Sequence, residues 1–334
     1  MENRKNVLVI GGAGFIGSHL CERLLRDSNV ICLDNFVSSS EKNINHLLKL
    51  PNFEFINHDM SVPIDLMNLV ELNSFQLKVF GISEVYNLAC PSSVKNFEKL
   101  RRETVYANTY ALINSLELAV KFKAKYMFFS SAVVYGAAPR DEYIDEAYRG
   151  ISDMLDPRAC YDEGKRYGES IVDTYRKVFS LDTKIVRVFR TYGPRMLIND
   201  GQIIPDFTVN ALENKDVIVY GTEDFRTSLC FVSDIVEGSM KVMASDINDP
   251  VNLGSTDVYK VSDVAQVIIQ LAGSSSKVIF EKEQLFLREL ALPNISKVKN
   301  ALGWFPIVTL EEGLQKTIDY TRAHKDLLTF SKEF

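Results

Sequence analysis

Gly11-Gly12-Ala13-Gly14-Phe15-Ile16-Gly17 is the stretch that decides the fold of this chain. The residues before it, Asn6–Ile10, form a continuous apolar run typical of a strand buried on both faces, and residues 18–26 have helical periodicity. The three glycines at every third position let the backbone turn tightly and approach a pyrophosphate, which then meets the free N–H groups of the helix. The strand, turn and helix together predict a dinucleotide-binding unit.

Strands and helices continue to alternate along the first 194 residues. Further strands are predicted at residues 29–33, 53–57, 84–88, 125–130 and 184–189, and longer helices at residues 65–80, 104–122 and 161–179. This alternation predicts an α/β fold of Rossmann type, with a doubly wound parallel sheet in a domain over residues 1–194. Beyond Pro194 the segments become shorter and mixed. We therefore expect residues 195–334 to form mainly a smaller mixed α/β substrate lid, and we leave open that some segments return to the core.

The composition narrows the class of protein. The chain has 334 residues, 46% of them hydrophobic, and a net charge of -6, which argues against a nucleic-acid partner because a polyanion requires a basic surface. Five cysteines without a C-x-x-C pair predict reduced thiols, with neither a disulfide framework nor a metal site. The polar first residues do not resemble a signal peptide, and no apolar run reaches the ~20 residues of a membrane span. We expect a cytoplasmic protein with no membrane partner.

An aspartate at the end of the second strand indicates which dinucleotide binds. Asp34 lies 17 residues after Gly17. A carboxylate there accepts hydrogen bonds from the adenosine ribose and repels a 2′-phosphate, so NAD is favoured over NADP. Asp59, after the third strand, is a weaker candidate for the adenine amino group, because aspartate is common in turns.

A Tyr-x-x-x-Lys pair supplies the candidate chemistry. Tyr161 and Lys165 are four residues apart at the start of a predicted helix and therefore share one helical face. A lysine ammonium beside a phenol lowers its pKa from ~10, so Tyr161 can exchange a proton with a sugar hydroxyl while hydride moves to or from the nicotinamide. Ser131 follows an apolar strand, where binding groups gather in open α/β sheets, and its hydroxyl can hydrogen-bond the reacting oxygen. The three residues after a dinucleotide motif are far more specific than Tyr-x-x-x-Lys alone.

In these residues the chain resembles the extended short-chain dehydrogenase/reductase family. Within that family it resembles UDP-glucuronate decarboxylases, over residues 52–59, 156–166, 192–196, 199–201, 232–234 and 251–254. The resemblance implies a nucleotide-sugar substrate and a homodimer built on the helices at 104–122 and 161–179. The candidate cofactor-binding residues are Gly11, Gly14, Phe15, Ile16, Gly17, Asp34, Asn35, Asp59, Met60, Leu88, Ala89, Asn108, Tyr161 and Lys165.

The chain departs from those relatives beside the catalytic serine. Ala132 and Val133 stand where the decarboxylases and the nucleotide-sugar 4,6-dehydratases have carboxylate residues. Elimination of water needs a general acid and base, so dehydration is disfavoured. Arg190 stands where the family usually has asparagine, either as a substrate contact or as a structural ion-pair residue. The candidate substrate-binding residues are Ser131, Arg190, Arg195 (for a diphosphate), Gln202, Tyr220 and Arg226.

The sequence thus predicts an NAD-dependent nucleotide-sugar enzyme that works at C4 through a 4-keto species, as a 4-dehydrogenase, 4-epimerase or ketoreductase. The alternative is a UDP-glucuronate decarboxylase that makes UDP-xylose, because formation of the 4-keto group itself makes the carboxylate a leaving group. An alternative of another class is a non-catalytic NAD-binding regulatory protein. The intact set of Ser131, Tyr161 and Lys165 argues against that last alternative.

Overall fold

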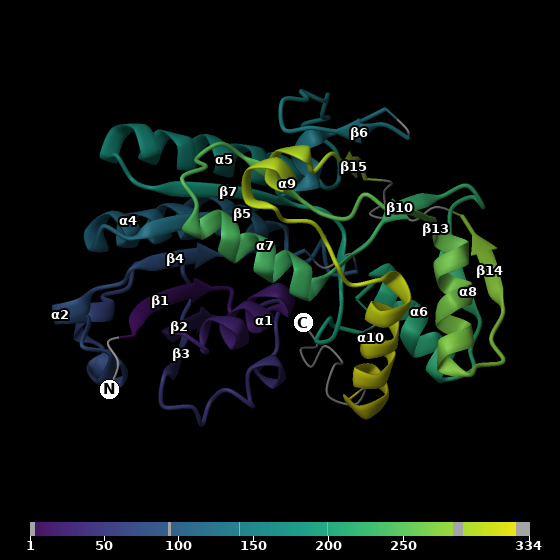
Figure 1. The fold of residues 1–334 in the computed structure, drawn as a ribbon, viewed down its shortest axis with the longest axis horizontal. Helices are drawn as coiled ribbons and strands as arrows, with labels where there is room; N and C mark the ends of the chain where they lie inside the picture. The colour runs from purple at the N-terminus through teal and green to yellow at the C-terminus, as the bar shows by residue number, and fades with distance from the viewer. Residues whose placement is uncertain (1–3, 93–94, 140, 199, 283–289, 325–334) are drawn as a thin grey trace.

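The fold is built on one seven-stranded sheet in which every neighbouring pair of strands is parallel. The computed structural model describes residues 4–92, 95–139, 141–198, 200–282 and 290–324. The strand order is β12-β7-β5-β4-β1-β2-β3, so the chain winds outward in both directions from β1 and β4 (Figure 1). The strands are β1 (Lys5–Ile10), β2 (Ser28–Asp34), β3 (Phe53–Asn57), β4 (Glu84–Asn87), β5 (Lys125–Ser131), β7 (Thr183–Val188) and β12 (Val251–Leu253). This arrangement confirms the predicted Rossmann-type fold.

Helices cover both faces of the sheet and bury its alternating side chains. The helices packed on it include α1 (Phe15–Leu24) and α7 (Val232–Ala244) on one face, and α4 (Leu112–Phe122) and α5 (Ala159–Phe179) on the other. Along β1, Val7 and Val9 belong to the core cluster of the first face, while Leu8 and Ile10 belong to that of the second. Successive side chains of a strand point to opposite faces, so a strand covered on both sides must be apolar throughout.

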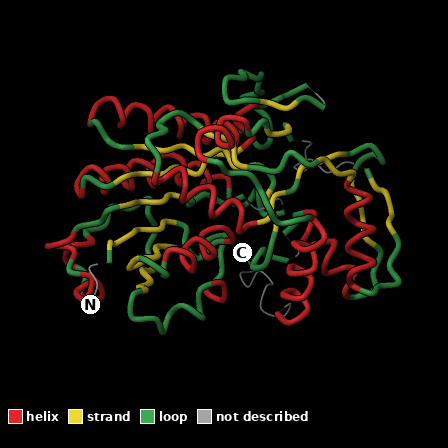
Figure 2. The backbone as a smooth tube through the Cα atoms, viewed as in Figure 1, coloured by secondary structure: helices red, strands yellow, loops and turns green. Residues whose placement is uncertain are grey.

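Several elements of the C-terminal part lie beside the sheet, whereas α7 packs on it and β12 belongs to it (Figure 2). Beside the sheet, α6 (Ile203–Leu212) packs against α8 (Val261–Ala272) and α10 (Leu310–His324), and β9 (Val217–Tyr220) pairs in parallel with β14 (Val278–Glu281). The remaining elements are α2 (Leu77–Phe80), α3 (Arg101–Tyr106), β6 (Tyr143–Ile144), β8 (Thr191–Tyr192), β10 (Arg226–Ser228), β11 (Cys230–Phe231), β13 (Val258–Lys260), β15 (Leu292–Pro293) and α9 (Ser296–Leu302). Strand β12 lies beyond residue 194 yet forms an edge of the main sheet, and the proposed domain boundary stays a prediction.

One predicted helix is wrong. Residues 65–80 form two short 3₁₀ segments, Leu66–Asn68 and Val70–Phe75, followed by the single turn of α2. Gln76 adopts a left-handed conformation with φ 47°, which interrupts a helix. The apolar side chains recur about every third residue, and tight turns bury such a pattern as well as a helix does.

Two further observations bear on the sequence-based expectations. All five cysteines are free, as expected of reduced thiols. Among the helices of the described residues, none combines the length and the apolar character that crossing a bilayer requires.

Candidate active site

A cavity of about 430 Å³ opens at the C-terminal ends of β1, β2, β4 and β5. Open α/β sheets bind their ligands in this place because the loops that follow the strands diverge there. Most of the predicted site residues line it: Gly11, Gly14, Phe15, Ile16, Gly17, Asp34, Asn35, Asp59, Met60, Leu88, Ala89, Ser131, Tyr161, Lys165, Arg195 and Gln202. Residues that are far apart in the sequence therefore meet in one cavity.

The glycine turn leaves room for a backbone-bound anion. Gly11 has φ +78°, and a Cβ added to it would lie 2.8 Å from the backbone nitrogen of Ala89. A Cβ on Gly17 would lie 2.2 Å from the carbonyl oxygen of Gly11. Gly14 precedes α1, and no side chain caps the first N–H groups of this helix. The first residues of α1 line the cavity. This cradle fits the pyrophosphate of a dinucleotide.

Asp34 is held in place by three hydrogen bonds. Its carboxylate accepts from the backbone nitrogens of Ala13 at 3.0 Å and Phe36 at 2.9 Å, and from the Ser39 hydroxyl at 2.7 Å. Burial raises the pKa of Asp34, while these hydrogen bonds act in the opposite direction. The fixed carboxylate at the end of β2 fits the predicted contact with an adenosine ribose.

The catalytic candidates meet where β5 ends against the first turns of α5. The Lys165 ammonium donates a hydrogen bond to the carbonyl of Phe129 at 2.9 Å, and it lies 5.8 Å from the ring centroid of Tyr161. Burial raises the pKa of Tyr161 above its ordinary value, and a hydrogen bond with Ser131 opposes that shift. The pKa of Tyr161 is therefore not lowered overall as the sequence predicted, because burial of the phenol outweighs the groups that lower it. The contribution of Lys165 itself stays a prediction.

Asn108 is not among the residues that line the cavity; it packs against the catalytic helix at Gly164. It lies in a π-helical turn, Ala107–Ala111, between α3 and α4, and its side chain is 1% exposed. Its amide donates to the carbonyl of Thr104 at 2.9 Å and to the sulfur of Cys90 at 3.2 Å. A Cβ on Gly164 would lie 2.7 Å from that amide nitrogen, so Asn108 fills the space beside the catalytic helix.

The sequence-based search missed two residues beside Tyr161. Cys90 lines the cavity directly after the candidate cofactor-binding residues Leu88 and Ala89, and this adjacency was the only signal for it. The guanidinium carbon of Arg158 lies 5.9 Å from the ring centroid of Tyr161, and its charge opposes the rise in the tyrosine pKa. Arg158 precedes Tyr161 by three residues, a spacing that places both on one side of a helical turn.

The residues predicted to bind the substrate do not all line the same cavity. Arg195 and Gln202 line the cavity, and Arg195 pairs with Glu22 of α1, on the side of the glycine turn. Arg226 lines a second cavity of about 460 Å³ together with Val133, and it pairs with Asp141 at 3.3 Å. A role for Arg195 in binding a substrate diphosphate stays a prediction.

Arg190 and Tyr220 are not among the residues that line either cavity. Arg190 follows β7, and its carbonyl accepts a hydrogen bond from the backbone nitrogen of Cys230 at 3.0 Å. Tyr220 ends β9, in the two-stranded sheet outside the core. The prediction that these side chains contact the substrate therefore has no support from their positions. Within the described part of the chain, no group of three or more His, Cys, Asp or Glu side chains is arranged to hold a metal ion.

Comparison with known proteins identifies the family. The family described as GDP-mannose 4,6 dehydratase matches residues 8–317. UDP-glucuronic acid decarboxylase 1 of Xenopus tropicalis is 37% identical over 322 residues, which span 96% of this chain and 73% of that protein. UDP-glucuronic acid decarboxylase 6 of Arabidopsis thaliana is 33% identical over 315 residues, which span 94% of this chain and 88% of that protein.

The chain belongs to the extended short-chain dehydrogenase/reductase family. Among solved structures, a UDP-glucuronic acid 4-epimerase from Bacillus cereus in complex with UDP-glucuronic acid and NAD superposes with a TM-score of 0.81 at 26% identity, over 95% of this chain and 99% of that one. An epimerase from Methanothermobacter thermautotrophicus gives a TM-score of 0.85 at 25% identity, over 98% and 96% of the two chains. The predicted family and enzyme class, an NAD-dependent nucleotide-sugar enzyme of the extended short-chain type, are confirmed.

Proposed function

We propose that this protein binds NAD in the cavity at the end of the sheet and converts UDP-glucuronate to UDP-xylose, through oxidation at C4 and loss of carbon dioxide. One observation carries the proposal. Ser131, Tyr161 and Lys165 line the same cavity as the glycine turn, in a chain that is 37% identical over 96% of its length to a UDP-glucuronic acid decarboxylase. The decarboxylase alternative is therefore better supported than the C4 redox or epimerase function that the sequence favoured.

In the first step, oxidation at C4, different residues of the chain bind the dinucleotide and move the proton. The cradle at Gly11 and Gly17 and the carboxylate of Asp34 hold the dinucleotide, which accepts hydride from C4 when bound. Tyr161 takes the proton of the C4 hydroxyl, and Ser131 orients that oxygen by a hydrogen bond. Lys165, fixed by the carbonyl of Phe129, places a positive charge beside the phenol as it loses its proton.

Loss of carbon dioxide does not require the carboxylate residues that this chain lacks. After oxidation at C4, the carboxylate on C5 is β to a ketone. The bond between C5 and the carboxyl carbon then breaks with its electron pair moving toward the C4 oxygen, where the Tyr161 and Ser131 hydroxyls donate hydrogen bonds. Carbon dioxide leaves, and a proton then adds to C5. The hydride taken up in the first step would return from the bound dinucleotide to C4, and Tyr161 gives its proton back to the C4 oxygen, so the product is UDP-xylose and the cofactor is again oxidised. Ala132 and Val133 are 1% and 7% exposed, and this step needs no acid or base from them.

A second candidate function is C4 redox or epimerisation of a nucleotide sugar without loss of carbon. It is favoured by Ala132 and Val133, because chemistry confined to C4 uses only Ser131, Tyr161 and Lys165. The same two residues argue against 4,6-dehydration. A non-catalytic NAD-binding protein would not need the three polar side chains at one point of the cavity.

The deciding experiment is product analysis with a panel of UDP-, dTDP-, GDP- and CDP-sugars, followed by mass spectrometry and absorbance at ~340 nm, the band of reduced nicotinamide. Release of carbon dioxide from UDP-glucuronate would support the proposal. A product of unchanged mass, or one two hydrogens lighter, from a neutral nucleotide sugar would favour C4 epimerisation or oxidation. Turnover of none of these sugars would contradict both functions.

We also propose that the protein is a homodimer that pairs through α3–α4 and α5. Large apolar side chains are exposed on these helices, among them Tyr106 and Tyr110 on one and Tyr167 and Phe179 on the other. Burial of such a surface is the main gain of association. Light scattering after size exclusion should give twice the chain mass, and Tyr110→Asp should shift the protein toward the monomer. A monomeric parent protein would contradict this proposal.

A further inference from the structure

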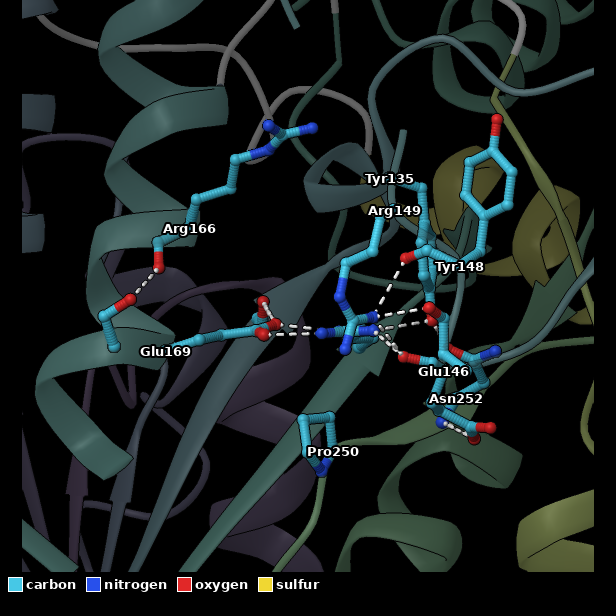
Figure 3. Close-up of polar contacts among 12 residues, drawn as sticks. Tyr135, Glu146, Tyr148, Arg149, Arg166, Glu169, Pro250 and Asn252 are labelled. Atoms are coloured by element: carbon cyan, nitrogen blue, oxygen red, sulfur yellow. Dashed lines mark hydrogen bonds and ion pairs between the residues drawn. The ribbon is translucent and has the colours of Figure 1, made fainter. Parts of the chain in front are cut away.

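The catalytic helix carries a carboxylate that the proposed chemistry does not use. Glu169 lies one turn beyond Lys165 on α5, on the same helical face. Its side chain is only 13% exposed, and Figure 3 shows it pointing from the helix toward a cluster of polar side chains. Taking a carboxylate out of water costs free energy unless partners replace the lost hydration, so its contacts identify what it does.

Glu169 joins three elements of the site. Arg187 of β7 binds it with two hydrogen bonds, from Nε to Oε1 at 2.9 Å and from Nη2 to Oε2 at 2.7 Å. The Ser130 hydroxyl at the end of β5 donates to Oε1 at 2.6 Å. Ser130 is the neighbour of Ser131. One carboxylate therefore fixes the strand end that carries the catalytic serine against the helix that carries Tyr161 and Lys165.

Arg187 extends the contact toward the C-terminal part of the chain. Its Nη1 donates to the hydroxyl of Tyr135 and to the carbonyl of Glu146, both at 3.0 Å. Tyr135 in turn donates to the side chain of Asn252 in β12 at 2.5 Å. Burial alone would lower the pKa of Arg187, but the bonds to Glu169 raise it above its ordinary value. The guanidinium is thus a permanent charge held by a carboxylate.

We propose that Glu169, held by Arg187, is a positioning residue that sets Ser131 and Lys165 relative to each other and presents a negative charge to the Lys165 ammonium. The Lys165 ammonium lies 4.8 Å from the ring centroid of Phe128 and 5.8 Å from that of Tyr161, and Glu169 lies one helical turn away. Burial lowers the pKa of Lys165, whereas electrostatic interactions with Cys90 and Glu169 act in the opposite direction. A well-packed apolar pair commonly stabilises a core as well as a buried ion pair does, so stability alone does not explain these charges.

The test separates the effect of the charge of Glu169 from the effect of its position. Only the measurement of activity rests on the proposed function. Glu169→Gln removes the charge, whereas Glu169→Asp keeps the charge and withdraws the carboxylate by about 1.5 Å, one C–C bond. Asp173→Asn is the matched control, because Asp173 lies one turn further along the same helix in an exposed pair with Arg176 and Lys177. Ser130→Ala removes the bond to the strand and leaves the ion pair intact.

Two readouts are taken on each variant. The first is the titration of Lys165, followed by the ¹³Cε resonance of labelled lysine in the protein without substrate, with Lys165→Met to identify the signal. The second is kcat and KM on the nucleotide sugar that the parent protein turns over. The titration does not depend on the substrate, so it remains informative if the parent protein turns over no sugar and the proposed function fails.

Glu169→Gln should lower kcat by about tenfold to 100-fold with little change in KM, because the reacting groups are misplaced. It should also move the titration of Lys165 to lower pH. Glu169→Asp and Ser130→Ala should lower kcat while Lys165 titrates as in the parent protein, and Asp173→Asn should change neither readout. An unchanged Lys165 titration in Glu169→Gln would overturn the electrostatic role. Full kcat in every variant, with only a lower melting temperature, would overturn the positioning role.

Discussion

Lys165 lies over the face of the Tyr161 ring, with its ammonium 5.8 Å from the ring centroid, while its hydrogen bond goes to the sheet at Phe129. The lysine is therefore anchored by the strand that also ends in Ser131. Because burial of the phenol outweighs the groups that lower its pKa, the pKa of Tyr161 lies above its ordinary value, whereas the sequence alone suggested a lower one. The catalytic group is therefore the assembly of the helix that carries Tyr161 and Lys165 and the strand end that carries Ser131.

Replacing Tyr161 with phenylalanine should abolish proton transfer and leave the cavity intact. We expect turnover to fall by about 100- to 10,000-fold, the contribution of a positioned acid–base group, while NAD binding persists. Steady-state kinetics and calorimetric titration with NAD measure the two effects. Tyr167→Phe, on the exposed side of the same helix, is the control and should behave as the parent protein. Undiminished turnover in Tyr161→Phe would rule out this tyrosine as the acid–base group.

Alanine at Gly11 should disrupt cofactor binding. The added Cβ would meet the backbone of Ala89 at 2.8 Å, and φ +78° costs an L-residue about 1–2 kcal/mol. Gly273→Ala is a matched control, because Gly273 also has a positive φ, +67°, but nothing lies within 4 Å of its added Cβ. Both variants should lose stability in urea unfolding because of the positive φ, and Gly11→Ala should lose more because of its backbone contact, whereas only Gly11→Ala should lose NAD affinity. Equal NAD affinity in the two would show that the cradle is not used.

Asp34 should determine the preference for NAD over NADP. Removing its charge in Asp34→Asn removes the repulsion of a 2′-phosphate and weakens the contact with the ribose. A charged hydrogen bond of this kind is worth about 1.5–3 kcal/mol, so we expect NAD affinity to fall by about 10- to 100-fold. The ratio between the affinities for NAD and NADP should become smaller. Dissociation constants for both dinucleotides measure this. Asp59→Asn, in the same cavity, should leave their ratio unchanged, and a preference that survives in Asp34→Asn would refute the assignment.

His19 should make the protein less stable in acid. Burial lowers its pKa from 6.5 to about 4, and its Nε2 contacts the carbonyl of Pro194 at 2.9 Å. Between these two values the unfolded chain carries the proton and the folded chain does not. The free energy of unfolding is therefore complete above about pH 7 and falls with acidification, by up to about 3 kcal/mol at pH 4.

Urea unfolding at several pH values tests this dependence on His19. His19→Gln can keep the contact with Pro194 but cannot be protonated, so its stability should fall less steeply between pH 6.5 and pH 4. His58→Gln is the control, because His58 also contacts a backbone carbonyl, that of Val62, but near the surface. An identical pH slope in His19→Gln and the parent protein would contradict the prediction.

Much of the fold could be predicted from local sequence. The apolar run at Asn6–Ile10 predicts a strand covered on both faces, because a strand with one face in water would alternate apolar and polar residues. The three glycines mark a turn through which the backbone can closely approach a pyrophosphate. Residues 65–80 were predicted wrongly, because their apolar spacing is the same in a helix and in the 3₁₀ turns that the structure has.

The sequence predicted those site residues whose position is set by the ends of the parallel strands. Asp34 and Ser131 are the last residues of their strands, and Ala89 follows β4. Parallel strands end at one edge of the sheet, so chain order sets the convergence of these residues. Tyr161 and Lys165 share a helical face by periodicity alone. By contrast, Tyr220 and Arg226 lie in the irregular C-terminal part, where the order of the residues does not fix which of them reach the cavity.

The sequence by itself determined the parallel sheet, the dinucleotide cradle and the convergence of Ser131, Tyr161 and Lys165, because these follow from period and strand order. Only the tertiary structure decided that burial raises the pKa of Tyr161 and that Glu169 pairs with Arg187. Burial and ion pairing depend on every element packed around a side chain. No local pattern encodes a contact between a helix and a strand that the fold alone brings together.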